Sequence, residues 1–294
     1  MLIISFAVAG TLLWWNTRPV HGAAELLPYL PPSESTILYA DFKALRQSGV
    51  LDMLAGSKFG EEAEYKDFVH RTGFDFRTDL DGALVSLQDT GTYLVVSGRF
   101  RWSEIEKYAA GSGGACVEGL CRVAGSRPDR QISFYLIRPN LLAMAVSPNP
   151  YAATLIAPHK IPPGGDFPNE PIWASVPSPV LREKDALPAG TRAFASALSS
   201  AERVTFSLGA DGARFQAMLQ VTCRDREEAA SLIAQLEGAT SMLRKLIARE
   251  NQTPNPRDLS GVLTAGTFRL DDRFVYGRWP LERAFLEAVA GGEI

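Results

Sequence analysis

The hydrophobic pattern changes period within the stretch from Arg203 to Arg249. Apolar and polar residues alternate over Val204–Leu208 and again over Phe215–Val221, which places each apolar set on one face of a β-sheet. Gly209–Gly212 supplies glycine and aspartate for a tight turn between the two strands. Apolar residues then recur at helical spacing over Leu232–Ile247. The pattern predicts a β-hairpin followed by a long helix, and packing on its own sheet is sufficient to explain the helical stripe.

The same changes of period divide the chain into two similar halves. Each half is predicted to follow the order β-α-α-β-β-α-β-β-α over roughly 120 to 130 residues, an ordinary domain size. The first half has predicted hairpins at Leu84–Gly98 and Ile132–Val146, and the second has a final hairpin at Val262–Gly277. We therefore expect an α+β protein with two related domains, each an antiparallel sheet with helices on one face. Divergent duplication is the preferred interpretation, although hairpin–helix units are common enough for coincidence.

Boundaries follow from the segments rich in proline and glycine, because these residues interrupt regular structure. The predicted segments are a signal peptide or membrane anchor at 1–22, an extended Pro-rich spacer at 23–35, a first α+β domain at 36–158, a linker at 159–171 and a second α+β domain at 172–294.

The N-terminal stretch Met1–Trp15 has no charged side chain. It is shorter than the roughly 20 apolar residues of a full bilayer span and fits the apolar region of a secretory signal better. No lysine or arginine precedes Arg18, so the usual basic start of a signal is missing. We expect an exported protein of the cell envelope, either membrane-anchored or periplasmic, and leave open whether the segment is cleaved.

Composition excludes some functions. With 30 Lys+Arg against 33 Asp+Glu, the net charge is −3, which does not favour nucleic acid as a partner. Hydrophobic residues are 46% and charged residues 21% of the 294, proportions typical of a globular protein.

Cysteine usage agrees with export. Cys116 and Cys121 lie close enough in sequence for a disulfide across a small loop if the chain folds back there. A metal site needs about four ligands, and no histidine lies nearby. Two unpaired thiols are the remaining alternative. Cys223 at a strand end is predicted to be a small buried apolar residue.

Two motifs carry a family resemblance. The sequence LLPYLPPSESTILYADFKAL, followed by TGFDFRTDLDG before a strand, resembles uncharacterised bacterial exported envelope proteins known only as domains of unknown function. The resemblance covers the first half best. It implies an exported α+β protein and transfers no active-site residues.

Candidate chemistry is sparse. Asp75, Asp79 and Asp81 could hold a divalent cation, but capping of a helix and a turn explains three such aspartates better. No G-x-S-x-G nucleophile motif or phosphate-binding loop is present, so no catalytic residue, cofactor or metal is predicted.

Three functions are compatible with this pattern. The first is a non-catalytic envelope module that binds or scaffolds an envelope protein partner and meets the membrane through its N-terminal segment. The second is a divergent hydrolase that uses carboxylates in a cleft between the domains. The third is a module that binds a lipid or a small apolar ligand. Enzymatic activity is the less favoured class.

Overall fold

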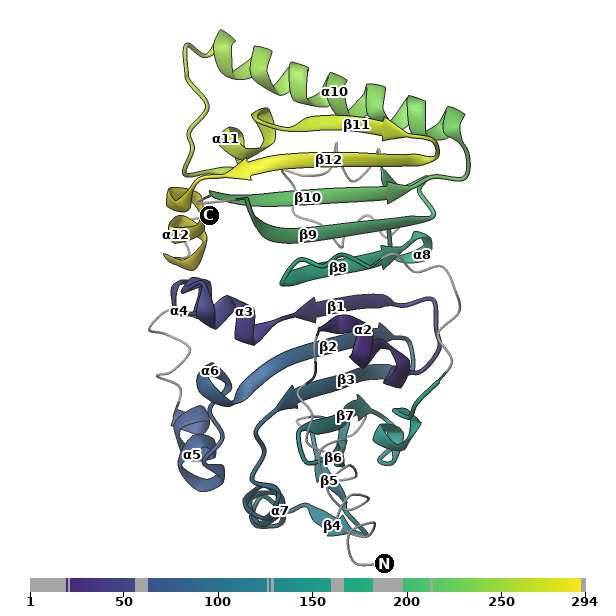
Figure 1. The fold of residues 1–294 in the computed structure, drawn as a ribbon, viewed down its shortest axis with the longest axis vertical. Coiled ribbons are helices and arrows are strands. Elements are labelled where there is room, and N and C mark those ends of the chain that lie inside the picture. Colours follow the sequence, from purple (N-terminus) through teal and green to yellow (C-terminus); the bar gives the residue numbers. More distant parts are fainter. Residues whose placement is uncertain are drawn as a thin grey trace, which may run out of the picture. The chain divides into compact units, whose positions relative to one another are not determined.

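The computed structural model describes residues 20, 22–55, 63–125, 127, 130–159, 167–181, 198–211 and 214–291. They form two compact units (Figure 1). The first unit takes its described residues from Met1–Ser33, Tyr39–Ser48 and Ser57–Asn169, and the second from Glu34–Leu38, Gly49–Gly56 and Glu170–Ile294. Strand β1 (Thr36–Ala40) contributes residues to both units, because the division falls between Leu38 and Tyr39. The predicted anchor Met1–Trp15 lies outside the described residues.

The first unit is an antiparallel sheet with short helices. Its strands lie in the order β2-β3-β7-β6-β5-β4. Their bounds are β2 (Leu80–Gln88), β3 (Gly91–Gly98), β4 (Ala115–Val117), β5 (Leu120–Ala124), β6 (Gln131–Arg138) and β7 (Leu141–Ser147). Its helices are α2 (Ala23–Leu26), η1 (Leu27–Tyr29), α3 (Phe42–Gln47), α5 (Ala63–Thr72), α6 (Phe76–Asp79), α7 (Trp102–Gly111) and η2 (Ala152–Leu155).

Helix α7 forms because its apolar residues recur every three or four positions. Ile105 and Ala109 are buried on one face, where they pack with Cys121 and Phe134 of the sheet. The ring of Trp102 meets that of Phe134 edge-on at 6.0 Å between centroids. The core of this unit therefore lies between α7 and strands β5, β6 and β7.

The second unit has the strand order β8-β9-β10-β12-β11, again antiparallel. Its strands are β8 (Ile172–Pro177), β9 (Arg203–Asp211), β10 (Arg214–Thr222), β11 (Thr267–Asp271) and β12 (Phe274–Leu281). Its helices are α4 (Val50–Ala55), α8 (Ser178–Leu181), α10 (Arg226–Arg249), α11 (Leu259–Thr264) and α12 (Arg283–Gly291). The predicted α+β class with antiparallel sheets and packed helices is confirmed.

Helix α10 begins at a capping aspartate, since the Asp225 side chain accepts a hydrogen bond from the Glu228 amide at 2.8 Å. Leu232 and Leu236 pack against Val221 and Val275 of the sheet. The helix runs alongside β11 (Figure 1). The predicted sequence of hairpin and long helix is thus present.

The two units share a strand order. In the first unit the hairpin β2–β3 precedes α7, and β7 of the next hairpin pairs with β3. In the second unit β9–β10 precedes α10, and β12 of the next hairpin pairs with β10. Between helix and second hairpin the first unit has the strands β4 and β5, whereas the second has α11. Divergent duplication predicts this shared order with local insertions.

Two predicted elements near the C-terminus are wrong. Val262–Thr264 is helical because the Asp258 side chain accepts from the Ser260 amide at 2.7 Å and begins α11. In the predicted order the last helix of the second half begins at Trp279, but Trp279–Leu281 continues β12 and α12 begins at Arg283. Pro280 is tolerated in this strand because the described pairing with β11 stops at Arg278, so the missing N–H group is not needed on that side.

A turn, a spacer and a helix also differ from the prediction. Gly209 pairs with Gln216 in the ladder, so β9 extends to Asp211, into the predicted turn. Residues 23–29 are helical instead of extended, because burial of Ala23 and Leu26 holds this segment in place. The predicted order ends the first half with a helix through Ala157, but this part of the chain forms only the short η2.

Candidate functional site

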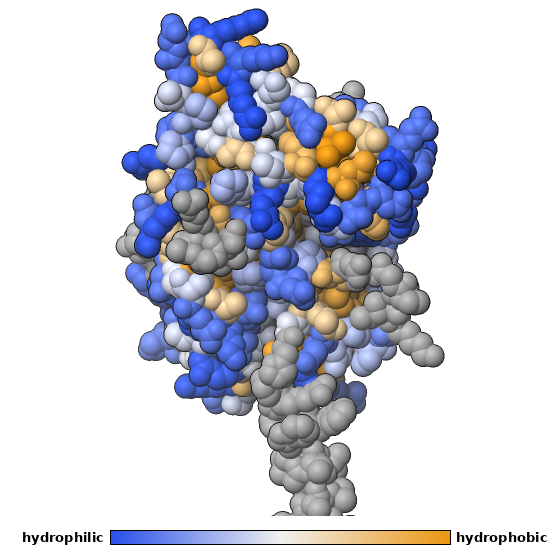
Figure 2. All heavy atoms as spheres, turned by 45° about the horizontal axis from the view of Figure 1, so that its top comes forward, coloured by the Kyte–Doolittle hydropathy of each residue, from blue (hydrophilic) through white to orange (hydrophobic). Residues whose placement is uncertain are grey.

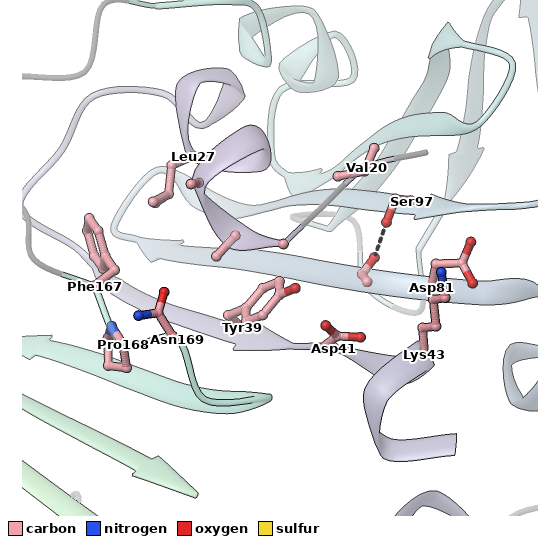
Figure 3. A pocket seen from close by; sticks show the side chains of 14 residues that line it. Val20, Leu27, Tyr39, Asp41, Lys43, Asp81, Ser97, Phe167, Pro168 and Asn169 are labelled. Carbon is pink, nitrogen blue, oxygen red and sulfur yellow. Dashed lines mark hydrogen bonds between the residues drawn. The ribbon is translucent and has the colours of Figure 1, made fainter. Parts of the chain in front are cut away.

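A pocket of about 550 Å³ lies within the first unit (Figure 3). Its walls come from α2, the end of β1, the start of α3, the paired strands β2 and β3, and the segment 167–169. The lining residues are Val20, Gly22, Ala23, Ala24, Leu27, Tyr39, Asp41, Lys43, Asp81, Gly82, Ser97, Phe167, Pro168 and Asn169. Segments far apart in sequence therefore form one concave surface.

The charged side chains of this pocket gather at one end. Figure 3 shows Lys43 and Asp81 at that end, and Leu27, Phe167 and Pro168 at the other, where the amide of Asn169 also lies. The pocket can therefore receive a molecule that has an apolar part and a polar part.

Tyr39 lies between the two ends and is buried (Figure 3). Burial, together with the negative charge of Asp41, raises the pKa of Tyr39 well above its ordinary value. Its hydroxyl group is therefore protonated at neutral pH and can donate a hydrogen bond. A Cβ atom built on Gly82 would lie 3.7 Å from this hydroxyl oxygen and 3.1 Å from Ser97 Oγ. Glycine at position 82 of β2 therefore leaves room for the Tyr39 hydroxyl group and the Ser97 side chain.

Both carboxylates of the pocket already have partners. Asp41 caps α3 by accepting a hydrogen bond from the Ala44 amide at 2.8 Å. Asp81 forms an ion pair with Arg46 at 3.1 Å, and the same guanidinium also donates to the carbonyl of Leu80. These interactions fix the carboxylates in place and leave neither as a free general base.

Lys43 is the cation at the polar end of the pocket. Its side chain is exposed, and among the described residues it forms no ion pair. An exposed ammonium group on the first turn of α3 can turn toward a bound anion or carbonyl group without losing an existing partner.

The three predicted metal-ligand candidates have separate partners. Asp75 accepts from the Arg77 amide at 2.9 Å and caps α6, and it also accepts from the Tyr65 hydroxyl at 2.7 Å. Burial and this hydrogen bond raise the pKa of Tyr65 to about 12. Asp79 forms an ion pair with Arg99 at 2.9 Å. Asp81 pairs with Arg46. Of the three aspartates, Asp75 is the one that caps a helix, as the capping interpretation predicts.

The sequence did not identify the pocket. Asp81, one of the three aspartates singled out in the sequence, lines the pocket and pairs with Arg46. Tyr39 and Lys43 lie in the segment LLPYLPPSESTILYADFKAL that carries the family resemblance, but that resemblance assigns no chemical role to either residue or to Ser97. The available signal was Gly82 inside a strand pattern, because such a glycine often marks a close approach of other groups.

Cys116 and Cys121 form a disulfide at the tip of the hairpin β4–β5. They are direct partners in the strand register, and the turn residues Glu118 and Gly119 both have positive φ, at 52° and 83°. Such values are typical of a two-residue hairpin loop. Cys223 is a buried free thiol, and burial, with the nearby charge of Glu228, raises its pKa to about 11.

Comparisons with known proteins give distant similarity. No family model matches the chain, and no curated protein matches it. Crystal form III of TP0453 is similar with a TM-score of 0.49 and 10% identity, over 92% of this chain and 98% of that one. Crystal form I of TP0453 is similar with a TM-score of 0.46 and 10% identity, over 93% and 98%. No function and no site residue follows from a likeness of this size.

Proposed function

We propose that this chain is a non-catalytic binding module and that its first unit holds a small amphipathic molecule. The observation that carries the proposal is that, within one pocket of about 550 Å³, the charged side chains lie at one end and three apolar side chains gather at the other. Leu27, Phe167 and Pro168 would contact the apolar part of the ligand. The Tyr39 hydroxyl and the Lys43 ammonium group would bind its polar part.

The chemistry of the lining supports binding over catalysis. Ser97 donates its hydroxyl hydrogen to the Gly82 carbonyl at 3.4 Å, and no histidine is among the described residues that line the pocket. A serine nucleophile needs a base that accepts its proton. A carboxylate base would need a raised pKa, but the pKa shifts that are resolved for carboxylates in the described residues are all downward, at Glu104, Glu228 and Asp258.

We further propose that the protein is exported and works in the cell envelope, where it meets an envelope partner. The apolar stretch Met1–Trp15 supports export through its composition. The Cys116–Cys121 disulfide supports it independently, because disulfides persist in oxidising compartments. Among the described residues no helix has the length and apolar character of a membrane span. Alkaline carbonate washing of membranes tests the anchor: a retained chain supports anchoring, and full release contradicts it.

The test of ligand binding compares probes that share one chain and differ in the head group. Isothermal titration of the full chain in dilute detergent would use decanoate, decanol and decylamine. Decanoate or decanol should bind in preference to decylamine, because Lys43 is the one cation at the polar end that lacks an ion pair with another described residue. Equal binding of all three would contradict a role for Lys43, and turnover of an ester analogue would favour a hydrolase.

A blocking variant locates the site. Ala24 is exposed on α2 and lines the pocket, so Ala24→Trp should fill the pocket without disturbing the core. Decanoate affinity should fall by at least about tenfold, a change of about 1.4 kcal/mol. Ala110→Trp, at an exposed position of α7 away from the pocket, is the matched control. Equal affinity in the two variants would place binding elsewhere.

A further inference from the structure

A carboxylate lies beside the disulfide of the first unit. Glu106 of α7 offers a carboxylate oxygen, and Cys116 and Cys121 offer their sulfur atoms, with all of these atoms within 4.8 Å of one another. The sequence pairs the two cysteines but gives no reason to add Glu106, which is ten residues before the first of them. The cluster lies outside the pocket described above.

The fold holds helix α7, which carries Glu106, close to the hairpin β4–β5. The Gly114 amide, three residues past the end of α7, donates to the Ala109 carbonyl at 2.9 Å. A Cβ atom at Gly114 would lie 2.5 Å from the Arg122 carbonyl oxygen, so helix and hairpin meet too closely for any other residue. Ala109 packs with Cys121 in the core, and Glu106 lies one helical turn before it. The backbone that carries Glu106 is therefore held beside the hairpin that carries both sulfur atoms, within reach of its carboxylate.

The disulfide restricts what this cluster can bind, since bonded sulfur atoms carry no charge. A dithiol reductant converts the Cys116–Cys121 disulfide into two thiols and is itself oxidised to a disulfide, with two electrons and two protons transferred. Two thiolates and one carboxylate then form an S₂O donor set. This set suits a borderline-soft divalent cation such as Zn²⁺, which binds sulfur at about 2.3 Å and carboxylate oxygen at about 2.1 Å.

The strand register provides the required spacing. Cys116 and Cys121 are direct partners in the antiparallel pair, so both side chains point to the same face. The Cα atoms of the two cysteines lie 4.0 Å apart, and the Cβ atoms of a disulfide lie about 3.5 to 4.5 Å apart. Two thiolates on one tetrahedral zinc ion lie about 3.8 Å apart, given the zinc–sulfur distance. The reduced thiols can reach this separation by side-chain rotation alone.

We propose that Glu106, Cys116 and Cys121 form a binding site for a divalent cation of the zinc class when the disulfide is reduced. The disulfide closes the site and reduction opens it. Three protein ligands leave the fourth position of a tetrahedral ion to water. Binding releases the two thiol protons, so affinity rises with pH.

The experiment uses the full chain in detergent, reduced with a phosphine under nitrogen and titrated with Cd²⁺. We expect an ultraviolet thiolate-to-cadmium charge-transfer band that saturates at one ion per chain, and no band from the oxidised protein. Cys116→Ser should abolish the band, whereas Cys223→Ser should leave it unchanged because that thiol lies outside the cluster. A reduced wild-type chain without the band, or one whose circular dichroism shows unfolding, would overturn the proposal.

The carboxylate has a matched control on the same helix. Glu104 is also partly exposed on α7, but it pairs with Lys107 and lies outside the cluster. We expect Glu106→Gln to weaken Cd²⁺ binding by about tenfold or more and Glu104→Gln to leave it unchanged. Equal affinities in these two variants would remove Glu106 from the site.

Discussion

Helices α7 and α10 hold the same place in their units, after the first hairpin and before the second, yet they cover their sheets differently. The 10-residue α7 ends soon after its last buried residue, Ala109. In the 24-residue α10 the last fully buried residue is Thr240, and the residues after it are partly or fully exposed. Of its later apolar residues, Met242 is 63% and Leu246 is 43% exposed.

The difference corrects one prediction. Packing on its own sheet was expected to explain the whole apolar stripe of α10, but Leu246 is exposed. A helix of 24 residues is about 36 Å long, which is more than the core beneath this helix covers. Figure 2, which turns the α10 side of Figure 1 forward, shows apolar side chains among hydrophilic ones on this surface. Helical periodicity predicts that a helix forms, and it does not predict how much of the stripe is buried.

The largest loss of stability is expected from a substitution in the buried part of α10. Leu236 is fully buried, so Leu236→Ala should lower the free energy of unfolding by about 2 to 5 kcal/mol. Ile105→Ala, at the matching buried face of α7, should have a cost in the same range. Urea unfolding followed by circular dichroism measures both. A loss below about 1 kcal/mol for Leu236→Ala would mean that α10 does not anchor its unit.

Substitution of the N-cap residue at the start of each helix should change stability by different amounts. Asp225 caps α10 with a side-chain hydrogen bond, whereas Arg101 at the same place in α7 makes none. Asp225→Ala should therefore cost about 1 kcal/mol in the free energy of unfolding, and Arg101→Ala much less. Equal costs, measured in the same urea experiment, would contradict the capping role of Asp225.

Lowering the pH should reduce the stability that Glu228 gives to the start of α10. Burial raises the pKa of Glu228, but hydrogen bonds from Arg224 outweigh this effect and leave the pKa below the ordinary value of 4.5. A lowered folded-state pKa stabilises the protein above about pH 4.5, and this stabilisation is lost as pH falls through the lowered value. The difference in unfolding free energy between wild type and Glu228→Gln should thus shrink on acidification from pH 6.

The corresponding carboxylate of α7 provides the control for this titration. The hydrogen bond and charge of Lys107 lower the pKa of Glu104, but its side chain is far more open to solvent than that of Glu228. Solvent screens such exposed pairs, so Glu104→Gln should change the acid response less. If Glu104→Gln changed the acid response more than Glu228→Gln, Glu228 would not be the main source of that response.

The smallest loss of stability is expected from substitutions in the exposed part of α10. Leu246→Ala and Met242→Ala should each change the free energy of unfolding by less than about 0.5 kcal/mol. A loss above about 2 kcal/mol would show that this part of the helix is covered in solution. Analytical ultracentrifugation of the wild type would then test for self-association.

Local pattern determined most of the secondary structure. Alternation over Val204–Leu208 and Phe215–Val221 predicted the strands β9 and β10, and helical spacing over Leu232–Ile247 predicted α10. These signals are local because a residue in a strand or helix shares its face with neighbours two to four positions away. The α+β class and the hairpin–helix–hairpin order shared by the two units follow from such signals.

Tertiary structure decided the rest, because the deciding contacts join residues far apart in sequence. Pro280 lies in a strand because the described pairing with β11 ends at Arg278. The pocket brings Leu27 and Phe167 to one surface, and Glu106 meets Cys121 only because helix and hairpin pack closely at Gly114. No periodicity in the chain encodes such long-range contacts, which depend on strand order and on how closely two backbones approach.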